Sequence, residues 1–209
     1  MYTHIVFDVD GTLIDTDDAI LLSLRDVLRD VLQKDVPADD LRFSFGITSV
    51  ATLDALGVKA RDTGRAMLLW KRYYMDYAGG ITVFGGVREA LERLAGTACI
   101  LGIITSKTRS EYELDFAQSG LAHYFDYVIC ADDTQKHKPH PEPMLKFIER
   151  SGADPAATVY IGDTEYDMRC AHGAGTAFAL AMWGGRGPEG IGADYRLSHP
   201  REILGLARR

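Results

Sequence analysis

The sequence predicts an α/β fold: a doubly wound parallel sheet with a helical segment inserted after its first strand. Short apolar runs rich in β-branched residues alternate with stretches of helical periodicity, and that alternation is typical of a sheet covered by helices on both faces. One long stretch near the N-terminus breaks the alternation, because it holds helical patterns and no convincing strand. The alternation predicts the core, and the break predicts the insertion.

Five apolar runs are predicted as strands buried on both faces. Each is short and almost wholly apolar, as expected where helices cover both faces of a parallel sheet. The predicted strands are His4–Asp8, Cys99–Thr105, Tyr127–Ala131, Thr158–Gly162 and Ala177–Ala181. In such Rossmann-like sheets, ligands bind at the carboxyl ends of the strands.

Four helices are predicted between these strands. The first has its apolar residues at helical spacing, and the other three are each followed by a glycine that fits a left-handed C-terminal cap. The predicted helices are Val87–Ala95, Ser110–Ser119, Pro141–Ser151 and Tyr166–Ala174, and the glycines are Gly120, Gly152 and Gly175.

The inserted segment is predicted to be a helical cap over residues 15–80, so that residues 1–14 and 81–209 form the core. Leucines at positions 21, 24, 28 and 32 form one helical stripe, and Met67–Tyr77 is a second helical stretch. We expect hinges near residues 13–16 and 79–86, where glycines punctuate the end of the insertion.

Composition excludes several classes of function. The net charge is −7 and no long basic run is present, which argues against a nucleic-acid groove. No apolar run approaches the roughly 20 residues of a membrane span, and the N-terminus reads directly as a strand without a signal peptide. We therefore expect a cytoplasmic protein, monomeric or weakly dimeric, that binds neither nucleic acid nor membrane.

Polar segments follow the ends of four predicted strands. They are Asp8–Thr12, Thr105–Lys107, Lys138–Pro139 and Gly162–Asp167. Each alone is common in turns and helix caps. Because the carboxyl ends of parallel strands meet at one edge of the sheet, four such segments in this order predict one catalytic site.

The residue types in these segments indicate phosphoryl transfer. Carboxylates at Asp8, Asp10 and Asp163 repel one another unless a cation lies among them. Mg²⁺ accepts one or two carboxylates together with phosphate oxygens and water, which suits this set. The metal and Lys138 would then offset the charge of a phosphate dianion beside a carboxylate nucleophile.

Roles follow from position. Asp8 ends the buried strand and fits the nucleophile that forms an aspartyl-phosphate intermediate. Asp10 lies at a glycine turn and fits the acid that protonates the leaving oxygen and then the base that activates water, which requires surroundings that raise its pKa. Thr105 and the backbone amide after it can donate to phosphoryl oxygens, and Pro139 biases Lys138 toward extended backbone.

Two alternative interpretations fit poorly. A calcium loop starting at Asp8 requires glutamate at its twelfth position, where Ala19 stands. A phospho-accepting receiver domain, which is not an enzyme, combines similar groups on a similar sheet. It places the phosphorylated aspartate after the third strand, however, and has no place for a long helical insertion.

The motifs resemble those of the haloacid dehalogenase-like hydrolase superfamily. They are Asp8–Leu13, Ile103–Thr105, Lys138–Pro139 and Gly162–Asp167. The resemblance covers nearly the whole chain. The inserted helices are similar in position to the small cap of the phosphoglycolate phosphatase and β-phosphoglucomutase group.

The resemblance implies a role for each motif residue. Asp8 would be nucleophile and metal ligand, and Asp10 the acid/base, with its backbone carbonyl on Mg²⁺. Asp163 would be a direct metal ligand and Asp167 a supporting one, and Thr105 and Lys138 would bind phosphate. The further substrate-binding or phosphate-binding candidates are Gly11, Thr12, Ser106, Lys107 and Gly46. Dehalogenases of the superfamily lack the second aspartate of the first motif, so its presence implies phosphate chemistry.

Local details bear on the substrate. Lys107 and the run Lys138–Pro143 look like the phosphoglycolate and pyrophosphate phosphatase branch. The segment Phe43–Val50 occupies the place where this group keeps its specificity loop. We expect a Mg²⁺-dependent phosphatase for a small phosphomonoester such as phosphoglycolate, while pyrophosphate hydrolysis and a β-phosphoglucomutase-like phosphomutase stay open.

Overall fold

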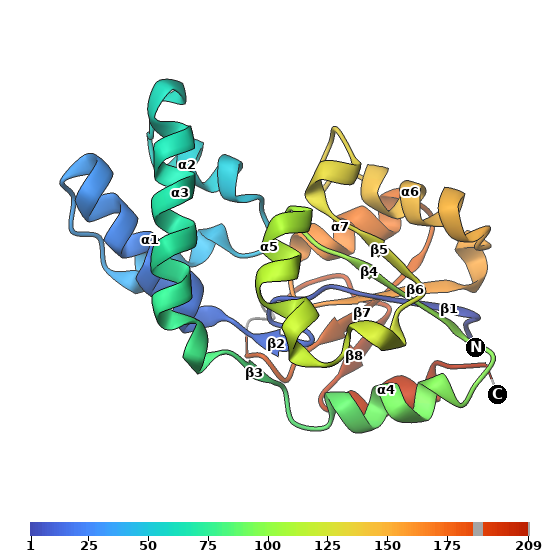
Figure 1. Cartoon of the computed structure of the whole chain (residues 1–209). Helices are drawn as coiled ribbons and strands as arrows, with labels where there is room; N and C mark the ends of the chain where they lie inside the picture. The colour runs from blue at the N-terminus through green and yellow to red at the C-terminus, as the bar shows by residue number, and fades with distance from the viewer. Residues whose placement is uncertain (186–189, 209) are drawn as a thin grey trace.

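The core of the molecule is a six-stranded parallel sheet (Figure 1). The computed structural model describes residues 1–185 and 190–208, so residues 186–189 and 209 of the predicted core lie outside the described part. The strands, in their order across the sheet, are β5 (Tyr127–Ile129), β4 (Ile100–Ile104), β1 (His4–Phe7), β6 (Thr158–Gly162), β7 (Ala177–Ala181) and β8 (Tyr195–Leu197). After β1 the strands are added first on one side, as β4 and β5, and then on the other, as β6, β7 and β8. Open α/β sheets bind ligands at the point where the strand order reverses in this way.

The central strand explains why the first apolar run is so continuous. β1 pairs on one side with β4 and on the other with β6. Ile5 and Phe7 pack into the hydrophobic cluster that includes α4, whereas Val6 faces the cluster that includes α6 and α7. All three residues are fully buried because both faces of the sheet are covered. The predicted doubly wound α/β core is confirmed.

The core helices lie close to their predicted bounds, with one exception. They are α4 (Val87–Ala95), α5 (Arg109–Leu114), α6 (Glu142–Ser151) and α7 (Glu165–Gly173). The helix predicted over residues 110–119 was wrong in its extent, because Asp115 leaves helical geometry and a 3-10 turn, Phe116–Ser119, follows. The Asp115 carboxylate accepts a hydrogen bond from the Phe116 amide and so caps that second turn.

Three short strands were not predicted. β8 lies at the sheet edge with two of its three residues exposed, so it gives no apolar run. β2 (Ile14–Asp15) and β3 (Thr82–Val83) pair antiparallel and have two residues each, too few for a periodic pattern. This ribbon joins the inserted segment to the core where the hinges are expected.

The inserted segment is helical and has its own apolar cluster. It contains α1 (Asp17–Leu32), a 3-10 helix (Ala38–Ser44), α2 (Ser49–Ala55) and α3 (Ala60–Tyr77). Leucines 21, 24 and 28 of the predicted stripe are buried against α3, including Trp70. Figure 1 shows these helices as a separate layer beside the sheet. These observations support a proposed cap over residues 15–80 and a core of residues 1–14 and 81–209.

None of the helices in the described residues is both long enough and apolar enough to span a bilayer.

Candidate active site

The strand-end segments meet at the carboxyl edge of the sheet, as the sequence predicts. Lys138, which follows β5, places its Nζ atom 2.8 Å from Asp8 Oδ1 and 2.7 Å from Asp167 Oδ1. Asp8 follows β1, whereas Asp163 and Asp167 follow β6. Oxygens of the three aspartates lie within 4.8 Å of one another, and all three side chains are buried.

Lys138 is a buried ammonium held by carboxylates. Burial alone would lower the pKa of Lys138, but the charges of Asp167 and Asp8 outweigh that effect and raise it above the ordinary value. Nζ also lies 3.3 Å from the Tyr160 hydroxyl, which is fully buried beneath it. The peptide bond from Lys138 to Pro139 is cis. The contacts with Asp8 and Asp167 keep the lysine charged and fix the direction of its side chain.

The Asp8 carboxyl has a raised pKa. Burial raises its pKa to about 7, the Lys138 ammonium opposes that rise, and the neighbouring carboxylates of Asp167 and Asp10 add to it. A cation placed among these carboxylates would favour the ionised form of Asp8.

The cluster fits a divalent cation by charge and donor type. Three carboxylates face one ammonium, which leaves a net charge of −3 + 1 = −2 when all are ionised. Asp167 has both oxygens engaged, since Oδ1 accepts from Lys138 and Oδ2 accepts from the amide and hydroxyl of Thr164. Asp163 accepts a hydrogen bond of 3.3 Å from the Thr12 hydroxyl. Asp8 and Asp163 therefore suit direct ligation, and Asp167 suits a supporting role.

A glycine at the end of β6 makes this arrangement possible. A Cβ atom at Gly162 would lie 2.6 Å from Asp167 Cγ, closer than two such atoms approach. Only glycine at this position allows the first turn of α7 to bring Asp167 against the strand end.

The Asp10 carboxylate lies outside the cluster of Asp8, Asp163 and Asp167. Its Oδ1 accepts a 2.7 Å hydrogen bond from the Thr16 hydroxyl and lies 2.8 Å from Lys107 Nζ. Of the three carboxylates expected to meet, Asp10 is thus directed toward the cap junction, and Asp167 completes the acidic group in its place. Asp10 still lines the same cavity as Asp8.

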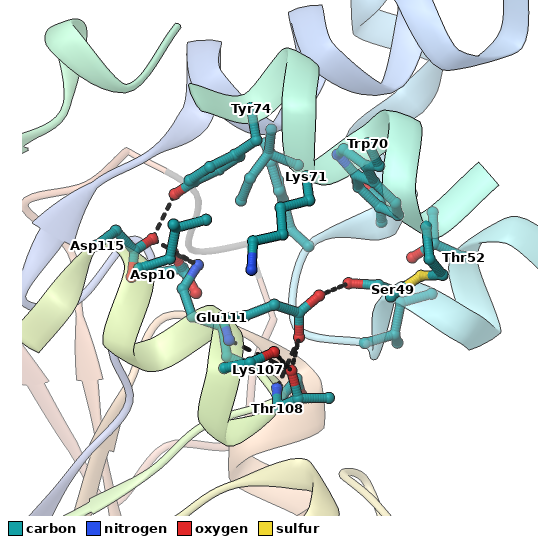
Figure 2. A pocket seen from close by; sticks show the side chains of 18 of the residues that line it. Asp10, Ser49, Thr52, Trp70, Lys71, Tyr74, Lys107, Thr108, Glu111 and Asp115 are labelled. Atoms are coloured by element: carbon teal, nitrogen blue, oxygen red, sulfur yellow. Dashed lines mark hydrogen bonds and ion pairs between the residues drawn. The ribbon is translucent and has the colours of Figure 1, made fainter. Parts of the chain in front are cut away.

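Lys107 joins Asp10 to the cap. Its Nζ lies 3.1 Å from Asp115 Oδ2, and the Tyr74 hydroxyl on α3 donates to the same oxygen (Figure 2). Burial would lower the pKa of Lys107, but Asp10, Tyr74 and Asp115 outweigh it, so this pKa lies well above its ordinary value. The predicted substrate-binding lysine is thus already paired with two carboxylates.

The remaining predicted residues lie in different places. The Thr105 hydroxyl accepts from the Lys107 amide at 3.1 Å and so keeps its own proton for donation. The Ser106 hydroxyl donates to the Gly46 carbonyl at 2.8 Å, a direct contact of core and cap. Gly11 and Thr12 turn the chain after β1 and are not among the described residues that line the cavity.

Gly46 brings the cap loop against the core. Its φ is +82°, and a Cβ atom there would lie 2.9 Å from Thr164 Oγ1 and 3.1 Å from Tyr166 Cδ2. The predicted loop Phe43–Val50 is only partly a loop, because α2 begins at Ser49. Thr48 caps that helix by accepting from the Ala51 amide, a capping signal that the sequence shows.

A cavity of about 340 Å³ separates the cap from the acidic cluster. Asp8 and Lys138 of the core line the cavity, and residues of α3 and α5 form its side walls (Figure 2). Ser44 and Ser49, from the segment Phe43–Val50 that the sequence indicates as a specificity loop, also line the cavity. The sequence did not single out the other polar and aromatic lining residues, which include Trp70, Lys71, Tyr74, Glu111 and Asp115.

Known proteins share this architecture. A profile of the haloacid dehalogenase-like hydrolase family matches residues 5–181. The pyrophosphatase PpaX of Bacillus velezensis is 29% identical over 206 residues, which cover 97% of this chain and 94% of that protein. The phosphoglycolate phosphatase of Aquifex aeolicus is 28% identical over 203 residues, which cover 97% of this chain and 95% of that protein. The crystal structure of a HAD-superfamily hydrolase, subfamily IA, variant 1, from Geobacter sulfurreducens superposes with a TM-score of 0.73 at 26% identity, covering 98% and 96%.

These matches settle the choice between an enzyme and a receiver domain. The family profile spans both the acidic cluster at the strand ends and the inserted helices. The chain belongs to the haloacid dehalogenase-like hydrolases and is a phosphatase of that family.

Proposed function

We propose that the chain is a Mg²⁺-dependent phosphatase that hydrolyses a small phosphomonoester of the phosphoglycolate type through an aspartyl phosphate on Asp8. The observation that carries the proposal is the position of Asp8. It is buried and lines the cavity, 2.8 Å from a buried ammonium and beside two further carboxylates. A phosphate dianion can approach a carboxylate nucleophile only where such positive charge offsets the repulsion.

Asp8, Asp163 and the backbone carbonyl of Asp10 would hold Mg²⁺, with Asp167 in support. When bound, the ion supplies positive charge that stabilises the charge developing on the phosphoryl oxygens. The net charge of −2 in the cluster and its hard oxygen donors support this assignment.

In the first step, an Asp8 oxygen forms a bond to phosphorus while the bond from phosphorus to the leaving oxygen breaks. Asp10, which is paired with Lys107 in this structure, would leave that pair, take up a proton and give it to the leaving oxygen. Asp10 then takes a proton from water as the water oxygen attacks the phosphorus of the aspartyl phosphate, which releases inorganic phosphate and regenerates Asp8. Lys138, the Thr105 hydroxyl and the Ser106 amide stabilise the phosphoryl oxygens during both steps.

The cap would exclude bulk water during these steps. Two hydrogen bonds support a closed position over the core: Ser106 donates to the Gly46 carbonyl, and Ser49 donates to Glu111 Oε1 at 2.7 Å. The antiparallel ribbon of β2 and β3 is the proposed hinge.

Hydrolysis of pyrophosphate is a second candidate, favoured by the similarity to the pyrophosphatase PpaX over 97% of the chain. It requires the same nucleophile and metal and changes only the leaving group. A phosphomutase would also form the aspartyl phosphate, but it would return the phosphoryl group to a sugar and release no inorganic phosphate.

Phosphate release from a panel of phosphoglycolate, pyrophosphate, sugar phosphates and p-nitrophenyl phosphate tests the proposal, with Asp8→Asn as the inactive variant. The exposed Asp76 provides a matched control in Asp76→Asn. We expect phosphate release by the unmodified chain and by Asp76→Asn, none by folded Asp8→Asn, and none in excess chelator. Turnover by Asp8→Asn near that of the unmodified chain would refute the nucleophile.

A further inference from the structure

The cavity contains three ammonium groups from the described residues, and two of them are already neutralised. Lys138 is paired with Asp8 and Asp167, and Lys107 is paired with Asp10 and Asp115. The third, Lys71, projects from α3 into the cavity (Figure 2), and it forms no ion pair with any described residue. Lys71 is exposed to solvent as well as lining the cavity, so an anionic group of a ligand can replace water at its ammonium.

The facing wall holds the Glu111 carboxylate, which forms no ion pair with Lys71 in the described part of the chain. The Glu111 carboxylate already accepts a 2.7 Å hydrogen bond from Ser49 Oγ and two of 2.7 Å from the amide and hydroxyl of Thr108. These bonds fix Glu111 as the N-terminal cap partner of α5. Lys71 thus lies across the cavity from a carboxylate whose hydrogen bonds go to Ser49 and Thr108.

A buried hydroxyl indicates that the cavity is built for a polar ligand. Ser44 lines the cavity and is 5% exposed, yet its Oγ atom has no hydrogen-bond partner among the described residues. A buried polar atom without a partner is costly, so such atoms are rare and commonly mark a place where a ligand or water binds. The observation is independent of Lys71 and lies on a different segment of the cap.

The charge of the cavity selects among leaving groups. One ammonium without an ion pair matches the single charge of one carboxylate, whereas the distal phosphate of pyrophosphate carries more negative charge than that ammonium offsets. The volume of about 340 Å³ is at the lower end for small-molecule sites and exceeds what a phosphoryl group alone would fill.

We propose that Lys71 is a specificity-determining residue that binds a carboxylate on the leaving group, so that the enzyme prefers phosphomonoesters of hydroxy acids to neutral esters and to pyrophosphate. The inference rests on the proposed phosphatase function and adds the residue that recognises the leaving group.

The test compares two esters with the same carbon skeleton. 3-Phosphoglycerate carries a carboxylate where glycerol 3-phosphate carries a hydroxymethyl group. We expect the unmodified chain to have a higher kcat/KM for 3-phosphoglycerate than for glycerol 3-phosphate or pyrophosphate. In Lys71→Met the ratio of kcat/KM for the two esters should fall at least about tenfold, a factor that corresponds to 1.4 kcal/mol. Lys71→Arg should retain most of the ratio, because it keeps the charge.

Lys34→Met, at an exposed cap position outside the cavity, is the control and should leave the ratio unchanged. An equal fall for both esters in Lys71→Met, no fall, or a preference of the unmodified chain for pyrophosphate would each overturn the inference. The proposed function fails separately: it requires p-nitrophenyl phosphate hydrolysis by the unmodified chain. If that hydrolysis occurs without a preference for 3-phosphoglycerate, only the role of Lys71 is wrong.

Discussion

Replacing Lys138 with methionine should destabilise the protein by about 3–5 kcal/mol, the cost of removing one partner from a buried ion pair. The ammonium lies 2.8 Å from Asp8 Oδ1 and 2.7 Å from Asp167 Oδ1, and these side chains are almost wholly buried. Methionine keeps an unbranched, flexible chain of similar size, so the loss reflects charge more than packing. It leaves two buried carboxylates next to Asp163 without a cation.

Urea unfolding in the presence of chelator measures the effect, with the free energy of unfolding taken by linear extrapolation. At pH 8 Asp8 is ionised in the unmodified chain, because this pH lies above its pKa of about 7, whereas loss of the Lys138 ammonium raises that pKa further in the variant. Lys146→Met is the control, since Lys146 pairs with Glu149 at the surface, where such a pair contributes about 0–1 kcal/mol. A loss below about 1 kcal/mol in Lys138→Met, no larger than in the control, would refute the account of the buried cluster.

Two further predictions concern the cap and the metal. Gly46→Ala should lower kcat/KM at least about tenfold, because its Cβ atom would meet Thr164 and push the cap loop off the core. Gly57→Ala is its control, since Gly57 has the same φ of +82° and nothing within 4 Å of the added atom; equal losses in both variants would show strain alone. Mg²⁺ binding, followed by calorimetry, should weaken roughly tenfold between pH 8 and pH 6, because the raised pKa of Asp8, about 7, lets a proton compete with the metal below that pH. An equal Kd at both pH values would contradict Asp8 as a ligand.

The buried strands and the strand-end motifs were predictable from sequence because local pattern and tertiary role agree there. β1 is buried throughout and apolar after His4 because both faces of the sheet are covered, and Asp8 follows it at the edge where ligands bind. β8 was not predicted because a largely exposed edge strand has no apolar run. The break at Asp115 was not predicted because two of the contacts that hold its side chain come from other segments, Tyr74 on a distant helix and Lys107 after β4.

The cavity walls were predictable only in part. Lys107 follows a strand end, so its position could be inferred from the sheet. Lys71 and Tyr74 lie on α3, whose periodicity identifies a buried face but does not reveal which other residues turn toward the core. The direction of the Asp10 carboxylate was likewise decided by Thr16 and Lys107, which belong to the cap junction and to the loop after β4.

The most direct test of the mechanism is to trap the phosphorylated residue. The enzyme would be quenched in acid during turnover of p-nitrophenyl phosphate and treated with borohydride, which reduces an aspartyl phosphate to homoserine. Peptide mass spectrometry would then locate the change. We predict homoserine at position 8 in the unmodified chain with substrate, and none without substrate. Steady phosphate release with Asp8 unmodified, or with the change at another carboxylate, would contradict the assignment of Asp8 as the nucleophile.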